Sequence, residues 1–549
     1  MTKFKNFLGN LGYSGLIIML ACGLTTLKIW QLDGDTWFLL NCGRYVVETG
    51  TIPHEEFASI HGGLHYVMQQ WLTAIIFWKI YSNFGADGLI IFAWIVGFIL
   101  TFVYYRMCLF VSGGNKTISV MLSMIICGII SSHFIVTRPW ILSTLLLLIE
   151  IFLLEKYFAE RKIWTLCALP ILSAIFINIH AAMWVMMIIV LLPYIAESLI
   201  LNFKNISTPF LPLIFAALGI FLAGFLNPYG WESMTYVFRS TDPSIRQLII
   251  EMRPLTADSI AATFFYIFSA LLIVAFSKKS LPIRYFFLTF GIMFMGFYSL
   301  RNLFIFFVLA TFPLALAAKN LHFDNFFILR PKLFIPLYLL CIPEIFFVCY
   351  RGQQSIYEIN LPMKILFAFT IFFLICFIFF YRKEGKLFSQ EIFILRRKPL
   401  IALVSLQLII FFAISYYSIP VRKYEPYKPA VEFLLSKNRA EDIILWTGYN
   451  SGGYFEFYKI KCYIDPRAET FLLSNNQKDD IFQEYKDLFS GDLDYREFFS
   501  RYNFTHIFVT KDDLILYLML SNDENYKLLF EYDFPDGKGH GRIFIPKKK

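Results

Sequence analysis

Runs of about 20 apolar residues recur through the first 420 positions of this 549-residue chain, and they constrain its fold more than any other feature. Each run is long enough to cross a hydrocarbon layer of about 30 Å as an α-helix. Apolar residues make up 58% of the chain and charged residues 16%, whereas soluble domains contain about 45–50% and about 25% respectively. The sequence therefore predicts a polytopic α-helical membrane protein.

Charged residues become frequent after Pro420, and no run of spanning length follows. We therefore expect a transmembrane domain over residues 1–420 and a soluble C-terminal domain, called the tail below, over residues 421–549. The formal net charge of +9 comes mostly from Lys and Arg beside the apolar runs, so it does not require a nucleic-acid partner. The partner that these charges indicate is the lipid bilayer.

The hydropathy pattern predicts spans at 11–31, 67–83, 86–105, 117–136, 140–156, 163–178, 181–200, 209–226, 259–276, 284–299, 302–318, 333–350, 363–381 and 399–417. Lys and Arg concentrate in alternate loops, which the positive-inside rule assigns to the cytoplasm. The first polar loop, residues 32–66, then lies outside the cell.

The sides that the positive-inside rule assigns to two early loops disagree with the number of predicted spans between them. An outward first loop and a cytoplasmic Arg106 require an odd number of crossings between them, yet two candidate spans lie there. The weaker candidate is 67–83, because it contains Gln69, Gln70 and Lys79. Either this segment does not cross fully, or the first charged loop is an exception to the positive-inside rule. With an inward N-terminus, 13 full crossings place the tail outside, whereas 14 place it inside. We favour 13 crossings.

The first loop contains the acidic pair Asp33 and Asp35 directly after the first span. Two carboxylates are costly inside hydrocarbon, so this pair belongs at the water interface. Together they could hold a divalent cation such as Mg²⁺ or Mn²⁺, or one could act as a general base. The alternative is a solvated turn after a helix.

The loop continues as a predicted amphipathic helix along the membrane surface, which ends at Gly50. Apolar residues at helical spacing form one face and polar residues the other: Phe38, Leu39, Cys42, Tyr45 and Val46 against Asn41, Arg44 and Glu48.

Further polar side chains interrupt or follow apolar runs on the same predicted side of the membrane: Arg138, His180, Glu251, Arg253 and Arg301. Each has a structural alternative. Arg138 could extend from a helix end to the interface, and His180 could bond to backbone. Glu251 and Arg253, in a second polar loop at 228–258, could form a surface ion pair. Arg301 is harder to explain structurally, because an arginine between two apolar runs has little water unless it faces a cavity.

The tail has the pattern of an α/β domain. Short apolar runs at 443–446, 462–464 and 506–509 predict buried strands, and helical patterns occur at 478–499 and 512–522. Residues 526–532 and 542–546 predict a closing hairpin. A glycine run at 448–453 could bind phosphate, although a tight turn is the simpler interpretation. Asp465 and Arg467 could anchor a loop or contact a ligand.

The first loop resembles that of the GT-C superfamily of membrane glycosyltransferases. It shares with them D-x-D-x-W at 33–37, followed by Gly43, Gly50, Ile52-Pro53, Phe57, Ser59 and Trp71. The match is to bacterial multi-spanning members whose tails carry a G-G-Y and a D-x-R pattern, as at 452–454 and 465–467. Arg138-Pro139, Asn178-x-His180, Asn227-Pro228-x-Gly230 and Arg301-Asn302 are similar as well. Ala181 and Met252 depart from the pattern, where glycine and tryptophan are expected.

This resemblance implies transfer of a sugar from a polyprenyl-phosphate donor to a glycan, lipid or protein acceptor on the outer face of the plasma membrane. Asp35 or Asp33 would then deprotonate the acceptor hydroxyl for an inverting displacement. Arg138, Arg253 and Arg301 would balance the departing phosphate, with His180 and Glu251 also binding substrate. Some members of the superfamily need a divalent metal and others do not, so a metal at Asp33 and Asp35 is left open.

Two other functions compete with this one. A lipid-linked sugar transporter or flippase would favour an internal repeat and a midplane site, and the sequence shows no such repeat. A non-catalytic protein of envelope-glycan assembly would use the tail to recruit partners.

Overall fold

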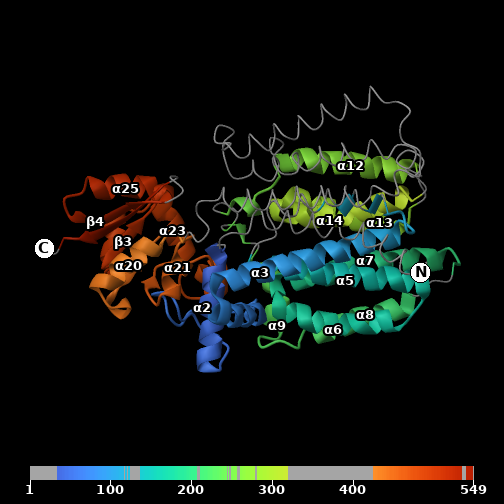
Figure 1. Ribbon diagram of the computed structural model, residues 1–549, viewed down its shortest axis with the longest axis horizontal. Coiled ribbons are helices and arrows are strands. Elements are labelled where there is room, and N and C mark those ends of the chain that lie inside the picture. Colours follow the sequence, from blue (N-terminus) through green and yellow to red (C-terminus); the bar gives the residue numbers. More distant parts are fainter. Residues whose placement is uncertain are drawn as a thin grey trace, which may run out of the picture.

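The computed structural model describes residues 34–116, 137–206, 210–240, 249–255, 260–278, 281–319, 425–534 and 539–547, with a few isolated positions between them. Three helices in these ranges are long and apolar enough to cross a membrane: α3 (Trp71–Val111), α7 (Ala181–Phe203) and α14 (Leu300–Ala317). Further apolar helices run beside them: α5 (Trp140–Glu160), α6 (Trp164–Ile179), α8 (Phe210–Ala223), α12 (Ile260–Lys278) and α13 (Ile283–Tyr298) (Figure 1). The predicted spans 11–31, 117–136, 333–350, 363–381 and 399–417 lie wholly or almost wholly outside the described residues.

Two predicted spans, 67–83 and 86–105, fall on the single element α3. Its backbone bends at Gly85, where φ is 65° and ψ is −161°, a conformation that glycine adopts without steric cost. The part before Gly85 packs against α2 (Gly34–Thr49), and a side chain at Gly43 would collide with the carbonyl oxygen of Ala74. The two helical segments that meet at Gly85 correspond to the two predicted runs, and together they form one of the three candidate membrane spans of the described residues.

Helix α2 lies across the ends of the long helices, next to the tail (Figure 1). It ends as predicted at Gly50, which has φ 69° and donates its N–H to the Val46 carbonyl at 2.9 Å. The tail covers part of the polar face of α2, while Glu48 at the end of the helix stays exposed. Asn41 is buried, and Arg44 lies over the rings of Trp78 and Phe457 at 5.8 and 5.0 Å.

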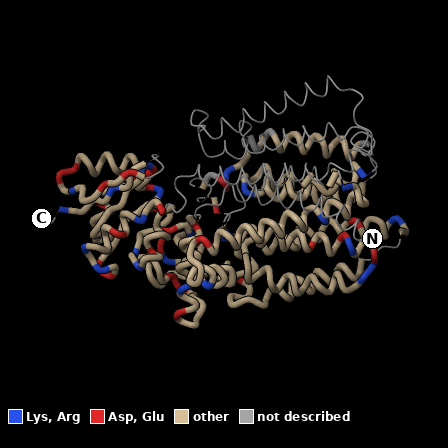
Figure 2. The backbone as a smooth tube through the Cα atoms, viewed as in Figure 1, with Lys and Arg blue, Asp and Glu red and all other residues tan. Residues whose placement is uncertain are grey.

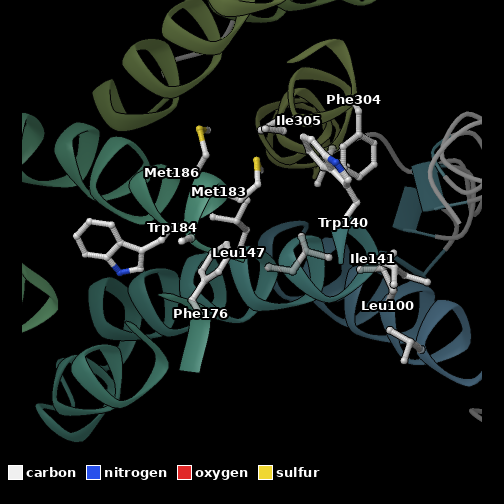
Figure 3. Packing of buried hydrophobic residues seen from close by; sticks show 14 of the residues in the cluster. Leu100, Trp140, Ile141, Leu147, Phe176, Met183, Trp184, Met186, Phe304 and Ile305 are labelled. Carbon is white, nitrogen blue, oxygen red and sulfur yellow. The ribbon is translucent and has the colours of Figure 1, made fainter. Parts of the chain in front are cut away.

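The apolar core joins α3, α5, α6, α7 and α14. Leu147, Phe176, Met183 and Ile305 come from four of these helices and meet in the interior (Figure 3). Charged residues gather mainly at the two ends of the helices and in the tail, and the middle carries few (Figure 2). This distribution fits a bilayer-spanning domain.

The tail contains a five-stranded sheet of order β2-β1-β3-β5-β4, which confirms the predicted α/β pattern and closing hairpin. Strand β1 (Ile444–Trp446) is parallel to β2 (Lys461–Cys462) and to β3 (His506–Val509). Strand β5 (His540–Pro546) is antiparallel to both β3 and β4 (Tyr526–Asp533). Leu445 pairs with Cys462 on one side and with His506 on the other.

The helical pattern at 478–499 corresponds to two helices rather than one, α23 (Ile481–Ser490) and α24 (Tyr495–Tyr502). Gly491 ends the first in the left-handed region at φ 83°, and the Asp494 carboxylate caps the second. The remaining helical elements of the tail are α20 (Lys428–Lys437), α21 (Gly452–Phe457), α22 (Leu473–Asn476), α25 (Leu514–Ser521), η3 (Ala440–Asp442), η4 (Ala468–Phe471) and η5 (Lys511–Asp513).

The tail packs directly on the first loop. The indole of Trp37 on α2 contacts the rings of Tyr454 and Phe457 on α21, with centroids 4.7 and 5.2 Å apart. The Ile60 N–H donates to the Cys462 carbonyl at 3.0 Å. First loop and tail therefore lie together at the same end of the helical domain.

Candidate functional site

The first turn of α2 contacts the residues just before α5. Two consecutive residues of each segment make these contacts. The Asp35 carboxylate and the Arg138 guanidinium form an ion pair at 3.0 Å. Beside it, the Thr36 hydroxyl donates to the Thr137 carbonyl at 2.8 Å. The Asp35 and Arg138 side chains retain 32% and 25% exposure, so water and a ligand can reach this pair.

A second ion pair lies beside the first. Glu251, on the short helix η1 (Ile250–Met252), pairs with Arg301 in the first turn of α14. Burial raises the pKa of the Glu251 carboxyl, but the positive charges of Arg301 and Arg138 outweigh it and the net shift is downward. Arg138 is thus close enough to act on both carboxylates, and the two ion pairs form one cluster.

Backbone contacts fix the second polar loop against the start of α14. The Ser299 hydroxyl donates to the Glu251 carbonyl at 3.1 Å, and the Leu300 N–H donates to the Arg253 carbonyl at 3.0 Å. The Arg253 side chain is exposed. The loop also contains the short helices α9 (Trp231–Met234) and α10 (Tyr236–Arg239).

His180 is buried instead of facing the open side of the cluster. Its Nδ1 lies 2.7 Å from the Ser143 hydroxyl, so the predicted bond to backbone is not what fixes the ring. Its ring packs edge-on against Trp140 at 5.7 Å, and the Arg301 guanidinium lies 5.6 Å from the same indole. His180 therefore supports Trp140, which in turn lies beside Arg301.

The metal prediction depends on Asp33, which lies outside the described residues. Among the residues that the structure describes, no group of three or more His, Cys, Asp or Glu side chains could hold a metal ion. Asp35 and Glu251 each have an arginine as close partner. These side chains do not form a metal-ligand set, so we derive no chemical step through a metal.

Two tail residues lie close to this cluster: Tyr449, within the glycine run at 448–453, and Glu469, which the sequence analysis did not single out. A side chain at Gly34 would contact the Asn450 carbonyl, which places the loop after β1 against the start of α2. Tyr449, in that loop, donates its hydroxyl to the Pro466 carbonyl at 2.8 Å. Burial raises the pKa of the Glu469 carboxyl, and the nearby Arg301 opposes this. The alternation Asp465, Arg467, Glu469 was the signal in the sequence that could have identified Glu469.

The glycine run at 448–453 allows close packing of the backbone. A side chain at Gly452 would collide with the Ile464 carbonyl, and one at Gly453 would lie 3.2 Å from the Phe38 Cβ. These glycines let α21 approach both the sheet and α2, and the phosphate-binding interpretation gains no support.

No protein-family model matches the chain, and no curated protein sequence matches it. Solved structures of similar fold are found. The crystal structure of the Archaeoglobus fulgidus oligosaccharyltransferase in the apo form has a TM-score of 0.53 and 11% sequence identity, over 98% of this chain and 74% of that one. The same archaeal enzyme tethered through a disulfide to an acceptor peptide containing the NVT sequon has a TM-score of 0.55 and 12% identity, with the same coverage. The chain therefore shares the fold of this archaeal enzyme.

Proposed function

We propose that this GT-C-type chain is a membrane glycosyltransferase that moves a sugar from a polyprenyl-phosphate donor to an acceptor hydroxyl on the outer face of the plasma membrane. The observation that carries the proposal is the part-exposed Asp35–Arg138 ion pair beside the Glu251–Arg301 pair. A part-exposed carboxylate would suit a base, and arginines beside it suit a phosphate. The archaeal fold supports this assignment.

In this proposal Asp35 is the general base. Its carboxylate takes the proton of the acceptor hydroxyl as the acceptor oxygen attacks the anomeric carbon. The bond from that carbon to the phosphate oxygen breaks, and its electron pair leaves with the polyprenyl phosphate. A single direct displacement of this kind inverts the configuration at the anomeric carbon.

The arginines balance the charge that develops on the departing phosphate. Arg138 and Arg301 present guanidinium groups from α5 and α14, and Arg253 adds a third from the second polar loop. A guanidinium stays protonated and can bind two phosphate oxygens at once. His180 would act indirectly through Trp140, by fixing the indole beside Arg301.

The tail places further groups where an acceptor would approach. Tyr449 lies near enough to Asp35, and Glu469 near enough to Arg301, for their charges to interact, and Met252 of the second polar loop packs into the tail's apolar core. The acceptor would be a glycan, a lipid or a protein that presents a hydroxyl to Asp35.

The test is transfer by purified protein in lipid vesicles, supplied with a panel of labelled polyprenyl-phosphate sugars and candidate acceptors. Label in a new glycosidic bond that wild type forms and Asp35→Asn does not would support the proposal. Asp492→Asn, an exposed tail carboxylate, is the matched control. Movement of the lipid-linked sugar across the bilayer without a new glycosidic bond would instead support a transporter.

A further inference from the structure

Arg467, in the tail loop after β2, is surrounded by three buried carboxylates. Its Nε lies 2.9 Å from an Asp465 oxygen, its Nη1 lies 2.7 Å from Glu56 and its Nη2 lies 3.7 Å from Glu456. None of these four side chains is more than 5% exposed. We call these four residues the Arg467 cluster.

The Arg467 cluster joins the tail to the first loop. Glu56 belongs to the first loop and accepts N–H groups from Ala58 and Ser59 at 2.7 and 2.8 Å. Asp465 and Arg467 belong to the tail, as does Glu456 on α21. Removing the tail would leave Glu56 without its arginine.

A short chain of contacts links the cluster to Asp35. Helix α21 carries Glu456 between Tyr454 and Phe457, whose rings pack on Trp37, two residues after Asp35. On the other side, the Arg467 guanidinium lies 5.0 Å from the Tyr66 ring, whose hydroxyl lies 3.5 Å from the Cys42 sulfur on α2. The position of α2 therefore depends on how the cluster is packed.

The cluster has more acids than its single arginine can neutralise. Within the described part of the chain, neither carboxyl oxygen of Glu456 has a hydrogen-bond partner. A buried carboxylate without a donor is costly, whereas a protonated carboxyl can donate to a neighbouring carboxylate. Burial and then the charge of Asp465 raise the pKa of Glu456 well above its ordinary value, against the opposing charge of Arg467.

The other titratable groups that face the cluster keep their charge near neutral pH. Burial raises the pKa of the Cys42 thiol to about 12, and it also raises the pKa values of the Cys462 thiol and the Tyr66 phenol. Glu456 is therefore the group whose protonation decides the charge balance.

We propose that the Arg467 cluster is a proton-dependent latch, which holds the tail on the first loop and so positions Asp35 while Glu456 is protonated. Arg467 and Glu456 are positioning residues, since they act on Asp35 through α21 and α2. The positioning of a catalytic base rests on the proposed function, whereas the latch itself does not.

The direction of the pH effect follows from linkage. A carboxyl whose pKa is raised in the docked state binds more protons there than in the undocked state, so docking weakens as pH rises. The weakening begins above the ordinary value of 4.5 and continues up to the raised pKa. Each pH unit in that window changes the docking equilibrium about tenfold.

Hydrogen exchange of the Ile60 amide tests the latch directly, because this amide donates to the tail at Cys462. Protection relative to an unstructured amide is measured on the full-length protein in detergent, from about pH 6 to about pH 9. Wild type should lose about tenfold in protection per pH unit in part of this range. Glu456→Gln, which mimics the neutral carboxyl, should keep its protection. Glu441→Gln, at an exposed glutamate of the tail, should behave as wild type.

Protection that falls in parallel in wild type and Glu456→Gln, or that does not change with pH in wild type, would overturn the proposal. Sugar transfer gives a second readout, in which the wild-type kcat should fall over the same pH range with a smaller change in the donor KM. The Glu456→Gln variant should move that fall to higher pH. Protection as expected with no transfer by any variant would overturn the proposed function and leave the latch standing.

Discussion

The two ends of the helical domain both carry arginine–carboxylate ion pairs, yet they differ in access to water. The open cluster, Asp35–Arg138 with Glu251–Arg301, has side-chain exposures between 25% and 45%. The sealed cluster, Arg284 with Glu155 and Glu197, has exposures of 6% to 12%. Glu155 follows Trp140 by 15 residues on α5, which separates the clusters by about 22 Å along the helix.

Hydrogen bonding distinguishes the clusters as clearly as exposure does. In the sealed cluster, Arg284 donates from Nε and Nη2 to Glu155 at 2.9 and 3.0 Å and from Nη1 to Glu197 at 2.6 Å. In the open cluster, Nε of Arg301 is buried and has no hydrogen-bond partner in the described part of the chain. An arginine whose N–H donors are all used stabilises the packing of helices, whereas a part-exposed arginine that keeps an unused donor can bind a ligand.

Replacing Asp35, the proposed base, should have the largest effect. We expect Asp35→Asn to lower the rate of sugar transfer about 10²–10⁴-fold, because no carboxylate then takes the proton from the hydroxyl of the sugar acceptor. Stability should change by less than about 1 kcal/mol, since the lost ion pair is part-exposed. Transfer assays and thermal unfolding in detergent measure the two quantities. Undiminished transfer would show that Asp35 is not the base.

Breaking the sealed cluster should reverse that pattern. Arg284→Met leaves Glu155 and Glu197 buried without their cation, so we expect a loss of about 3–5 kcal/mol in the free energy of unfolding. Transfer per folded molecule should be nearly unchanged. Lys162→Met, at an exposed lysine of the same end, is the control and should stay within about 0.5 kcal/mol. Normal stability with lost transfer would assign the ligand site to this end.

Acidification should affect the open end through the tail interface. His61 of the first loop packs between tail aromatics, and burial lowers its pKa to about 4, against the opposing charges of Glu484 and Asp479. A histidine with a lowered pKa stabilises docking above its ordinary value of 6.5, and this contribution is lost as pH falls towards about 4.

Glu456 changes docking in the opposite direction above pH 4.5, so the contribution of His61 is measured as the difference in Ile60 amide protection between wild type and His61→Phe. We expect this contribution to fall by about 3 kcal/mol over that interval. His61→Phe places a ring without a titratable group between the same tail aromatics, so this variant should lack the acid dependence. If the variant and wild type respond alike to acid, a group other than His61 causes the pH dependence of docking below neutral pH.

The smallest effect is expected at the second pair of the open cluster. Arg301→Lys keeps the charge but loses the planar fork and the contact with Trp140, and should lower transfer about 10–100-fold. Arg439→Lys, at an exposed tail arginine, is the matched control. Equal rates for Arg301→Lys and wild type would show that a positive charge is sufficient there. The planar guanidinium and its contact with Trp140 would then not be required.

The sequence identified the members of the open cluster but not their pairing. Glu251 and Arg253 stand two residues apart and suggested each other as partners, yet Glu251 pairs with Arg301, on another helix. No signal in the sequence indicated that Arg284 is part of a buried cluster, because neither Glu155 nor Glu197 is near it along the chain. Linear spacing predicts pairs only within one helix or strand, and these pairs join different helices.

Local signals in the sequence by themselves determined the helical membrane domain, the α/β tail and the end of α2 at Gly50. Hydropathy, periodicity and glycine at a helix end act within a few residues of chain, so they can be read without knowing the fold. Only the tertiary structure decided that Asp35 meets Arg138 and that Arg467 meets Glu56, 411 residues earlier. Such contacts depend on where whole helices and the tail lie, because side-chain charges interact through space and not along the chain.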